Sequence, residues 1–370
     1  MLVAGKAVTV MVKTEIHDHS NYLIRMEILN ELLEALGYNV AYRMIQTRSK
    51  PAVDYLLGRG KLEELKDKVK AIDPDIIVFY NTLTSKQKWN LEKALRAEVL
   101  DRYDVVLRIF NETSRDILSK LQIQLAELRK SFPYIKLQAA MKFKKTRAGF
   151  KGGGEYAYHK QINAVQKRIK ILKNKIEKIK EARMLEIEKR KSRGDKIAVL
   201  VGHYNAGKTT LFNKLTGLNR PVGPLPFTTL SSKYAKVGDN LLIVDTIGFV
   251  VDQDPRLISS FEINLLDILN SDIVVLVIDS SDKWAKFQLK LKEVLRILDS
   301  IGVAREKIIP VLNKSDLMSP EELEWRSIEL KKAGFDRIVA ISAEKEMGID
   351  LLVDEIRKAL RKEQIELAKI

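Results

Sequence analysis

Residues 197–209 read IAVLVGHYNAGKT, an aliphatic run that leads directly into a glycine-containing turn ending in Lys208 and Thr209. The turn from Gly202 to Thr209 satisfies the pattern GxxxxGK[ST] and lies between a predicted strand, 197–201, and a predicted helix, 210–215. In that context its backbone amides and the positive end of the helix point at phosphate oxygens. The stretch therefore predicts a phosphate-binding loop in an α/β domain, for which we expect the bounds 194–370.

Three more motifs follow predicted strands farther along the chain. Asp245-Thr-Ile-Gly248 ends the strand 241–245, Asn313-Lys-Ser-Asp316 follows the strand 307–312, and Ser342-Ala343 follows the strand 337–341. Lys208 is expected to bridge β- and γ-phosphate oxygens, and Asp245 and Thr209 are expected to hold Mg²⁺. A carboxylate at Asp316 would accept hydrogen bonds from guanine and be left without partners by adenine, so GTP or GDP is the expected ligand.

The first 112 residues predict a small βα-repeat domain with a parallel sheet, because strand-like and helix-like patterns alternate. The predicted strands are 7–12, 39–44, 75–79 and 105–109, and the predicted helices are 22–36, 61–71 and 85–97. From Thr113 the apolar period is helical, and residues 162–179 carry an a/d seam. We expect an antiparallel helical hairpin over 113–193, joined by residues 133–155, where three consecutive glycines argue against a helix. The seam would serve a hairpin or a dimer, and we expect a monomer.

Charge is concentrated in one segment of the chain. Residues 129–196 hold 22 Lys and Arg against six acidic residues, an excess of 16 that equals the net charge of the whole chain. Such a segment favours binding to a polyanion such as RNA, and a solvated helix face or a flexible linker is the alternative. The candidate RNA contacts, which interleave with two Phe residues, are Lys142, Lys144, Lys145, Arg147 and Lys151.

Composition excludes two other classes of protein. The chain has no Cys, which excludes disulfides and thiolate metal clusters and favours a cytoplasmic location. Its longest aliphatic run, Ile273 to Ile278, falls far short of the roughly 20 residues of a membrane-spanning helix.

Together these motifs resemble those of a known family. The four motifs of the C-terminal half look like those of P-loop GTPases of the translation-factor class, and Pro226-Phe-Thr-Thr229-Leu resembles the switch I motif of the Obg and HflX groups. The stretches 58–65, 87–92, 100–102, 124–128 and 153–155 are similar to the N-terminal half of HflX. On these residues the chain is identified as a member of the HflX family.

The resemblance implies a GTP-hydrolysing switch that binds the large ribosomal subunit and its RNA and, in bacterial members, helps to split ribosomes. The basic hairpin and the loop 58–64 would face the RNA. The additional C-terminal domain of many bacterial members is not expected here, which makes subunit splitting a weaker inference than subunit binding. The alternative hypothesis is an RNA-binding module that senses the nucleotide but hydrolyses GTP poorly, for example in ribosome assembly.

The resemblance also assigns roles to single residues. Thr229 would be the switch threonine that contacts Mg²⁺ and the γ-phosphate, with Thr228 as the alternative, and Lys208, Thr229 and Gly248 would carry catalysis. Phe249 stands where related enzymes place a water-orienting Gln, so a slow intrinsic rate raised by a partner or by K⁺ at Asn205 is expected. The complete predicted nucleotide site is Gly202, Asn205, Ala206, Gly207, Lys208, Thr209, Thr210, Thr229, Asp245, Gly248, Asn313, Lys314, Asp316, Ser342 and Ala343.

Overall fold

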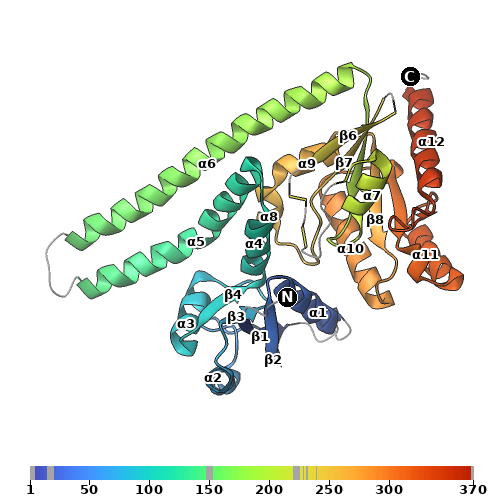
Figure 1. The fold of residues 1–370 in the computed structure, drawn as a ribbon. Coiled ribbons are helices and arrows are strands. Elements are labelled where there is room, and N and C mark those ends of the chain that lie inside the picture. The colour runs from blue at the N-terminus through green and yellow to red at the C-terminus, as the bar shows by residue number, and fades with distance from the viewer. Residues whose placement is uncertain are drawn as a thin grey trace. The chain divides into compact units, whose positions relative to one another are not determined.

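The computed structural model describes residues 5–14, 21–146, 153–219, 226–227, 229–230, 232–238 and 240–367, and only the backbone of 142–146, 153–158 and 362–367. The chain forms two compact units, Met1–Lys178 and Ile179–Ile370 (Figure 1). Both are α/β, as the sequence predicts. In the described part of the chain, no helix has the length and apolar composition needed to cross a membrane.

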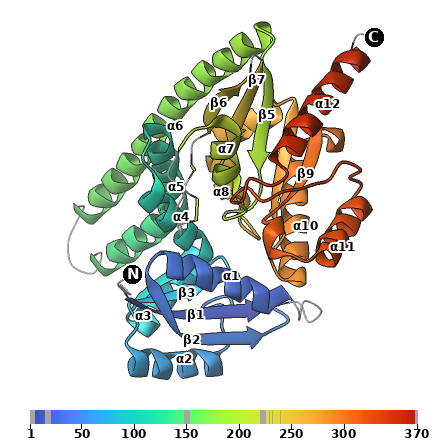
Figure 2. The same cartoon turned by 45° about the vertical axis from the view of Figure 1, so that its right-hand side comes forward.

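The first unit is built on a parallel four-stranded sheet of order β2-β1-β3-β4, of which Figure 2 labels β2, β1 and β3. Its strands are β1 (Gly5–Lys13), β2 (Tyr38–Thr47), β3 (Ile76–Phe79) and β4 (Glu98–Asp101), and its helices are α1 (Asn21–Ala35), α2 (Arg59–Ile72), α3 (Ser85–Leu95) and α4 (Arg102–Thr113). Val8, Val10 and Phe79 are fully or almost fully buried in the core on one side of this sheet. The predicted loop 58–64 is largely the first turn and a half of α2, because Gly58 is the residue that precedes this helix.

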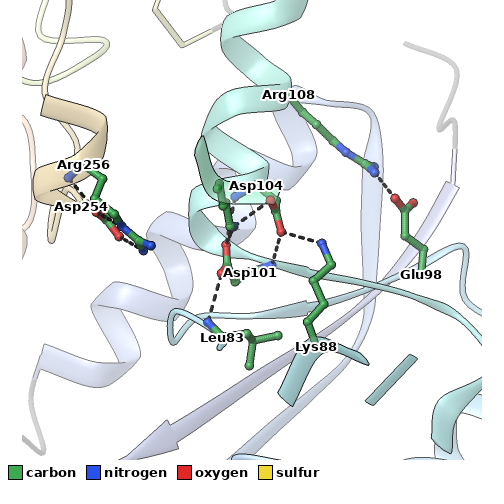
Figure 3. A network of polar contacts seen from close by, with 9 residues as sticks. Leu83, Lys88, Glu98, Asp101, Asp104, Arg108, Asp254 and Arg256 are labelled. Atoms are coloured by element: carbon green, nitrogen blue, oxygen red, sulfur yellow. Dashed lines mark hydrogen bonds and ion pairs between the residues drawn. The ribbon is translucent and has the colours of Figure 1, made fainter. Parts of the chain in front are cut away.

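The predicted strand 105–109 is wrong, because these residues lie in α4 and the strand is the preceding segment, 98–101. Asp101 explains why the helix starts where it does (Figure 3). Its carboxylate is almost fully buried and accepts from the amides of Leu83, at 3.1 Å, and Asp104, at 3.0 Å. Asp104 returns a bond to the Asp101 amide, which completes a capping box. Residues 105–109, which follow the capping box, are mostly apolar because α4 is buried on most of its faces.

The helical hairpin consists of α5 (Ile117–Thr146) and α6 (Gly153–Ser192). The predicted joining segment, 133–155, is too long, since α5 continues through Pro133 and α6 begins at Gly153. Glycine is tolerated in the first turn because the amides there have no intrahelical acceptor. The seam of α6 is confirmed in part, because Ile162 and Leu172 are buried, whereas its other members are only half-buried, namely Val165, Ile169, Ile176 and Ile179.

The second unit contains a six-stranded sheet of order β10-β9-β8-β5-β7-β6, parallel except for β6. Apolar cores cover both faces of the sheet, one with the long helix that follows β8 and the other with the helices that follow β5 and β10. Its strands are β5 (Lys196–Val201), β6 (Lys233–Val237), β7 (Leu241–Asp245), β8 (Ile273–Asp279), β9 (Ile308–Asn313) and β10 (Val339–Ala340). Its helices are α7 (Lys208–Thr216), α8 (Pro255–Ser260), α9 (Glu262–Leu269), α10 (Trp284–Ser300), η1 (Arg305–Lys307), η2 (Ser315–Leu317), α11 (Pro320–Lys332) and α12 (Ile349–Leu367).

Candidate active site

The turn between β5 and α7 has the backbone that a phosphate-binding loop requires. Gly202 has φ 153°, and a Cβ at this position would lie 2.1 Å from the carbonyl oxygen of Val277 in the neighbouring strand β8. Gly207 has φ 89°, and a Cβ there would lie 2.2 Å from Nδ2 of Asn313. Any larger residue would push β5 away from β8 or displace Asn313, so both positions are restricted to glycine. The loop ends at Lys208, where α7 begins and directs its amides into the site.

Lys208 is 7% exposed and folds back over the loop. Its Nζ donates to the carbonyl oxygens of Gly202, at 3.2 Å, and His203, at 2.8 Å. Burial lowers the pKa of Lys208 to about 8, with the charge of Asp245 opposing this shift and that of Lys290 adding to it. The amino group is therefore a buried cation whose two carbonyl partners compensate its charge only in part. An anionic ligand at the same place would compensate it much better.

Three side-chain oxygens meet beside the loop. Asp245 Oδ2 accepts from the Oγ1 atoms of Thr209, at 2.9 Å, and Thr229, at 2.7 Å, and the two hydroxyl oxygens are 3.2 Å apart. Adjacent ligands of an octahedral ion with ligand distances of about 2.1 Å are separated by about 3 Å, so this spacing fits Mg²⁺. Asp245 is fully buried and Thr229 is 8% exposed, which keeps the three oxygens in place.

The segment after Gly248 lies against the loop rather than away from it. The Phe249 amide donates to Gly202 O at 3.0 Å, and the Tyr204 amide donates to Phe249 O at 3.1 Å. The Phe249 side chain is 2% exposed and belongs to the apolar core beside α10. This side chain has no hydrogen-bonding group and does not reach the site, so it cannot orient a water molecule there.

His203 was not predicted to have a role, and it holds this arrangement together. Its Nδ1 lies 3.1 Å from Phe249 O and its Nε2 lies 2.8 Å from Lys290 O in α10. Burial, followed by the charge of Lys290, lowers the pKa of His203 to about 3, so the ring is neutral near pH 7. A neutral ring carries one N–H and therefore donates to one of these two carbonyl oxygens. The partners lie 46 and 87 residues away in the chain, and no local pattern in the sequence indicates them.

Aromatic side chains cover the outer side of the phosphate loop. The rings of Phe227 and Tyr204 are tilted against each other with centroids 5.3 Å apart, and Phe227 is 3% exposed. The cavity beneath them has a volume of about 60 Å³. This is room for about two water molecules. The residues that line it are Tyr204, Asn205, Gly207, Lys208, Thr209, Thr210, Phe227, Thr229, Thr246 and Gly248.

At the other end of the site, Asn313 links the phosphate loop to the last motif. Its Nδ2 donates to Ala206 O at 2.8 Å, and its Oδ1 accepts from the Ala343 amide at 3.0 Å. Asn313 is 2% exposed and Ser342 is fully buried. The amide side chain therefore fixes two loops at once.

The residues after β9 form the part of the site that is predicted to bind the guanine base. Lys314 has φ 61°, and its Nζ donates to Asp279 Oδ2 at 2.5 Å. Burial raises the pKa of Asp279, but Lys314 and the bonds from Ser281 outweigh burial and hold that pKa below its ordinary value. Asp316, in η2, is exposed, so its carboxylate is accessible to a guanine edge.

The structure brings the predicted nucleotide-site residues together along the carboxyl ends of β5, β7, β9 and β10. The competing residue Thr228 lies outside the described residues. So do Arg147 and Lys151, and the side chains of Lys142, Lys144 and Lys145 are not described either. The candidate RNA contacts therefore remain predictions.

Comparisons with known proteins cover nearly the whole chain. Family models match at residues 24–111, described as "GTP-binding GTPase N-terminal", at 115–190, "GTP-binding GTPase Middle Region", and at 197–314, "50S ribosome-binding GTPase". A protein of Thermofilum pendens named "GTPase HflX" is 36% identical, with 91% of this chain and 80% of that protein covered. One of the same name from Thermococcus kodakarensis is 34% identical, with coverages of 90% and 77%.

A solved structure is similar in fold as well. The crystal structure of the SsGBP and GDP complex superposes with a TM-score of 0.51 at 26% identity, covering 95% of this chain and 98% of that one.

Proposed function

Since this chain belongs to the HflX family of GTPases, binds guanine nucleotides and hydrolyses GTP, we propose that it acts as a nucleotide switch on the large ribosomal subunit. The observation that carries the proposal is the match of residues 197–314 to the family of 50S ribosome-binding GTPases. The excess of positive charge over 129–196 supports it, because ribosomal RNA is a polyanion.

In the proposed site, Thr209, Thr229 and Asp245 hold Mg²⁺ through the three oxygens described above. The ion, when bound, neutralises charge on the β- and γ-phosphates. Lys208 exchanges its two carbonyl partners for phosphate oxygens, and the Gly248 amide reaches the γ-phosphate from the switch segment. Asp316 selects guanine, with Lys314 beside it and the Ser342-Ala343 turn at the far edge of the base.

Hydrolysis in this site is slow without help. Phe249 is buried and cannot position water, so catalysis rests on phosphate binding and on a group supplied from outside. A ribosomal partner is one source. A K⁺ ion beside Asn205, which is exposed and lines the phosphate cavity, is another. Turnover measured in matched K⁺ and Na⁺ buffers tests the second source, and equal rates would exclude it.

Co-sedimentation with purified ribosomal subunits tests the ribosomal proposal. We expect the protein to sediment with the large subunit in the presence of a non-hydrolysable GTP analogue and to be released with GDP. Changing Lys142, Lys144, Lys145 and Arg147 together to Gln should abolish binding, because four positive charges that attract ribosomal RNA are lost. A matched control changes four exposed lysines of the second unit, namely Lys283, Lys331, Lys332 and Lys358. Binding that is equal with both nucleotides, or equal binding to both subunits, would contradict the proposal.

A further inference from the structure

The last three turns of α6 make side-chain contacts with α9, the helix that follows the switch segment. Near the start of α9, Lys180 Nζ lies 2.6 Å from Glu262 Oε1. Just past its end, Lys191 Nζ donates to Asn270 Oδ1 at 3.0 Å. All of these residues belong to the second unit. The C-terminal part of α6 is thus fixed to α9 at both ends of the shorter helix.

The middle of this contact is a buried polar cluster around Asp267 of α9. Asp267 is 3% exposed, accepts from the Tyr234 hydroxyl of β6 and lies 3.5 Å from Arg183 Nε of α6. The guanidinium groups of Arg183 and Arg190 lie 4.3 and 4.1 Å from the centroid of the Tyr234 ring. Burial and the charge of Asp267 raise the pKa of Tyr234, which keeps its hydroxyl protonated as a donor. One carboxylate therefore joins three elements.

One turn earlier on the same helix, Asn264 contacts the segment that contains Thr229 and Leu230. Its amide Nδ2 donates to the carbonyl oxygen of Leu230, and the side chain is 1% exposed. Leu230 directly follows Thr229, whose hydroxyl lies 2.7 Å from Asp245 Oδ2. Residues three apart on a helix share a face, so one side of α9 carries both Asn264 and Asp267.

We propose that Asn264 and Asp267 are positioning residues that couple Thr229 to α6. Asn264 holds the backbone beside Thr229, and Asp267 ties the same helix to Arg183. The inference rests on the proposed contact of Thr229 with Mg²⁺ and the γ-phosphate. Since GDP has no γ-phosphate, loss of the coupling weakens binding of GTP and spares GDP. The effect is reciprocal, so a ligand that shifts α6 changes the preference of the site for GTP over GDP.

The test measures affinities for GDP and for a non-hydrolysable GTP analogue in saturating Mg²⁺, using the full chain. Asn264→Ala should weaken analogue binding about tenfold and GDP binding less than about twofold, because a buried carbonyl loses its donor. Asn90→Ala is the matched control. Its amide also donates to a distant carbonyl, Asp54 O at 3.0 Å, but it lies in the first unit. Unchanged GDP affinity shows that the Asn264 variant is folded.

A second pair of variants tests the connection to α6. Arg183→Met should shift the analogue-to-GDP affinity ratio in the same direction by about threefold. Combined with Asp267→Asn it should give less than the sum of the two single effects, because both changes remove the ion pair between Arg183 and Asp267, while Arg183→Met also removes the contact with the Tyr234 ring. Lys189→Met, which removes an exposed charge from the same helix, should leave the ratio unchanged.

Thr229→Ala separates failure of this inference from failure of the proposed site. A ratio that shifts in Thr229→Ala but in neither Asn264→Ala nor Arg183→Met would overturn the coupling and leave the proposed role of Thr229 standing. A ratio that does not change even in Thr229→Ala would overturn both.

Discussion

Lys208 should destabilise the protein in the absence of nucleotide, and replacing it with Met should make the nucleotide-free protein more stable. Burial lowers the pKa of this lysine from 10.5 to about 8, so near pH 7 the folded protein carries a buried charge that the unfolded chain keeps in water. The difference of about 2.5 pKa units corresponds to about 3 kcal/mol. The lost hydrogen bonds reduce this gain only in part, because Gly202 O also accepts from the Phe249 amide and His203 O also accepts from the Ala206 amide.

The sign of the pH dependence follows from the same shift. Between pH 8 and 10.5 the unfolded chain binds a proton at Lys208 that the folded protein does not, so stability from this group rises with pH across that window. In Lys208→Met this contribution is absent. Groups that do not interact with Lys208 titrate equally in both proteins, so the difference between the two curves removes their contribution.

Urea denaturation of wild type and Lys208→Met at several pH values from 7 to 10.5 measures both quantities. We expect the variant to be more stable by about 1 to 3 kcal/mol at pH 7, with the difference shrinking toward pH 10.5, while its GDP binding is lost. A variant that is less stable at pH 7, or a difference that does not change with pH, would refute the reasoning.

Three other substitutions have clear expected outcomes. In thermal denaturation, Gly202→Ala should lower the free energy of unfolding by about 3 kcal/mol or more, because its Cβ would meet the Val277 carbonyl. Gly217→Ala is the control, and because there is open space around this glycine it should lower the free energy of unfolding by only about 1 kcal/mol. Asn313→Ala leaves Ala206 O and the Ala343 amide without this partner, and calorimetry should find GDP binding weakened at least about tenfold. Asp101→Ala removes the cap of α4 and the acceptor for the Leu83 amide, so urea denaturation should show that the free energy of unfolding falls by about 2 to 4 kcal/mol. GTP hydrolysis by the second unit is the control and should be unaffected.

The nucleotide site could be predicted from the sequence because its chemistry restricts residue type at fixed spacing. Gly202 and Gly207 have no substitute in their conformations, and Asp245 and Asn313 each end a strand, so their local patterns also place them in space. Asp279, which pairs with Lys314, stands in an ordinary strand sequence, and nothing local marks its role.

The incorrect predictions arose where a local pattern admitted two structures. Residues 105–109 are β-branched enough for a strand, and only the capping box at Asp101 and Asp104 shows that a helix starts before them. Pro133 normally ends a helix, but α5 continues through it. His203, Asn264 and Asp267 were not found because their partners are distant in the chain and are known only once the fold is known.

The length of α6 is large compared with the part of it that contacts α9. Its 40 residues span about 60 Å, and the stretch from Lys180 to Lys191 that contacts α9 accounts for about 16 Å of this. The remainder of α6 carries basic residues such as Lys167, Arg168 and Lys170, so one helix contains both the proposed coupling contact and part of the charged segment 129–196.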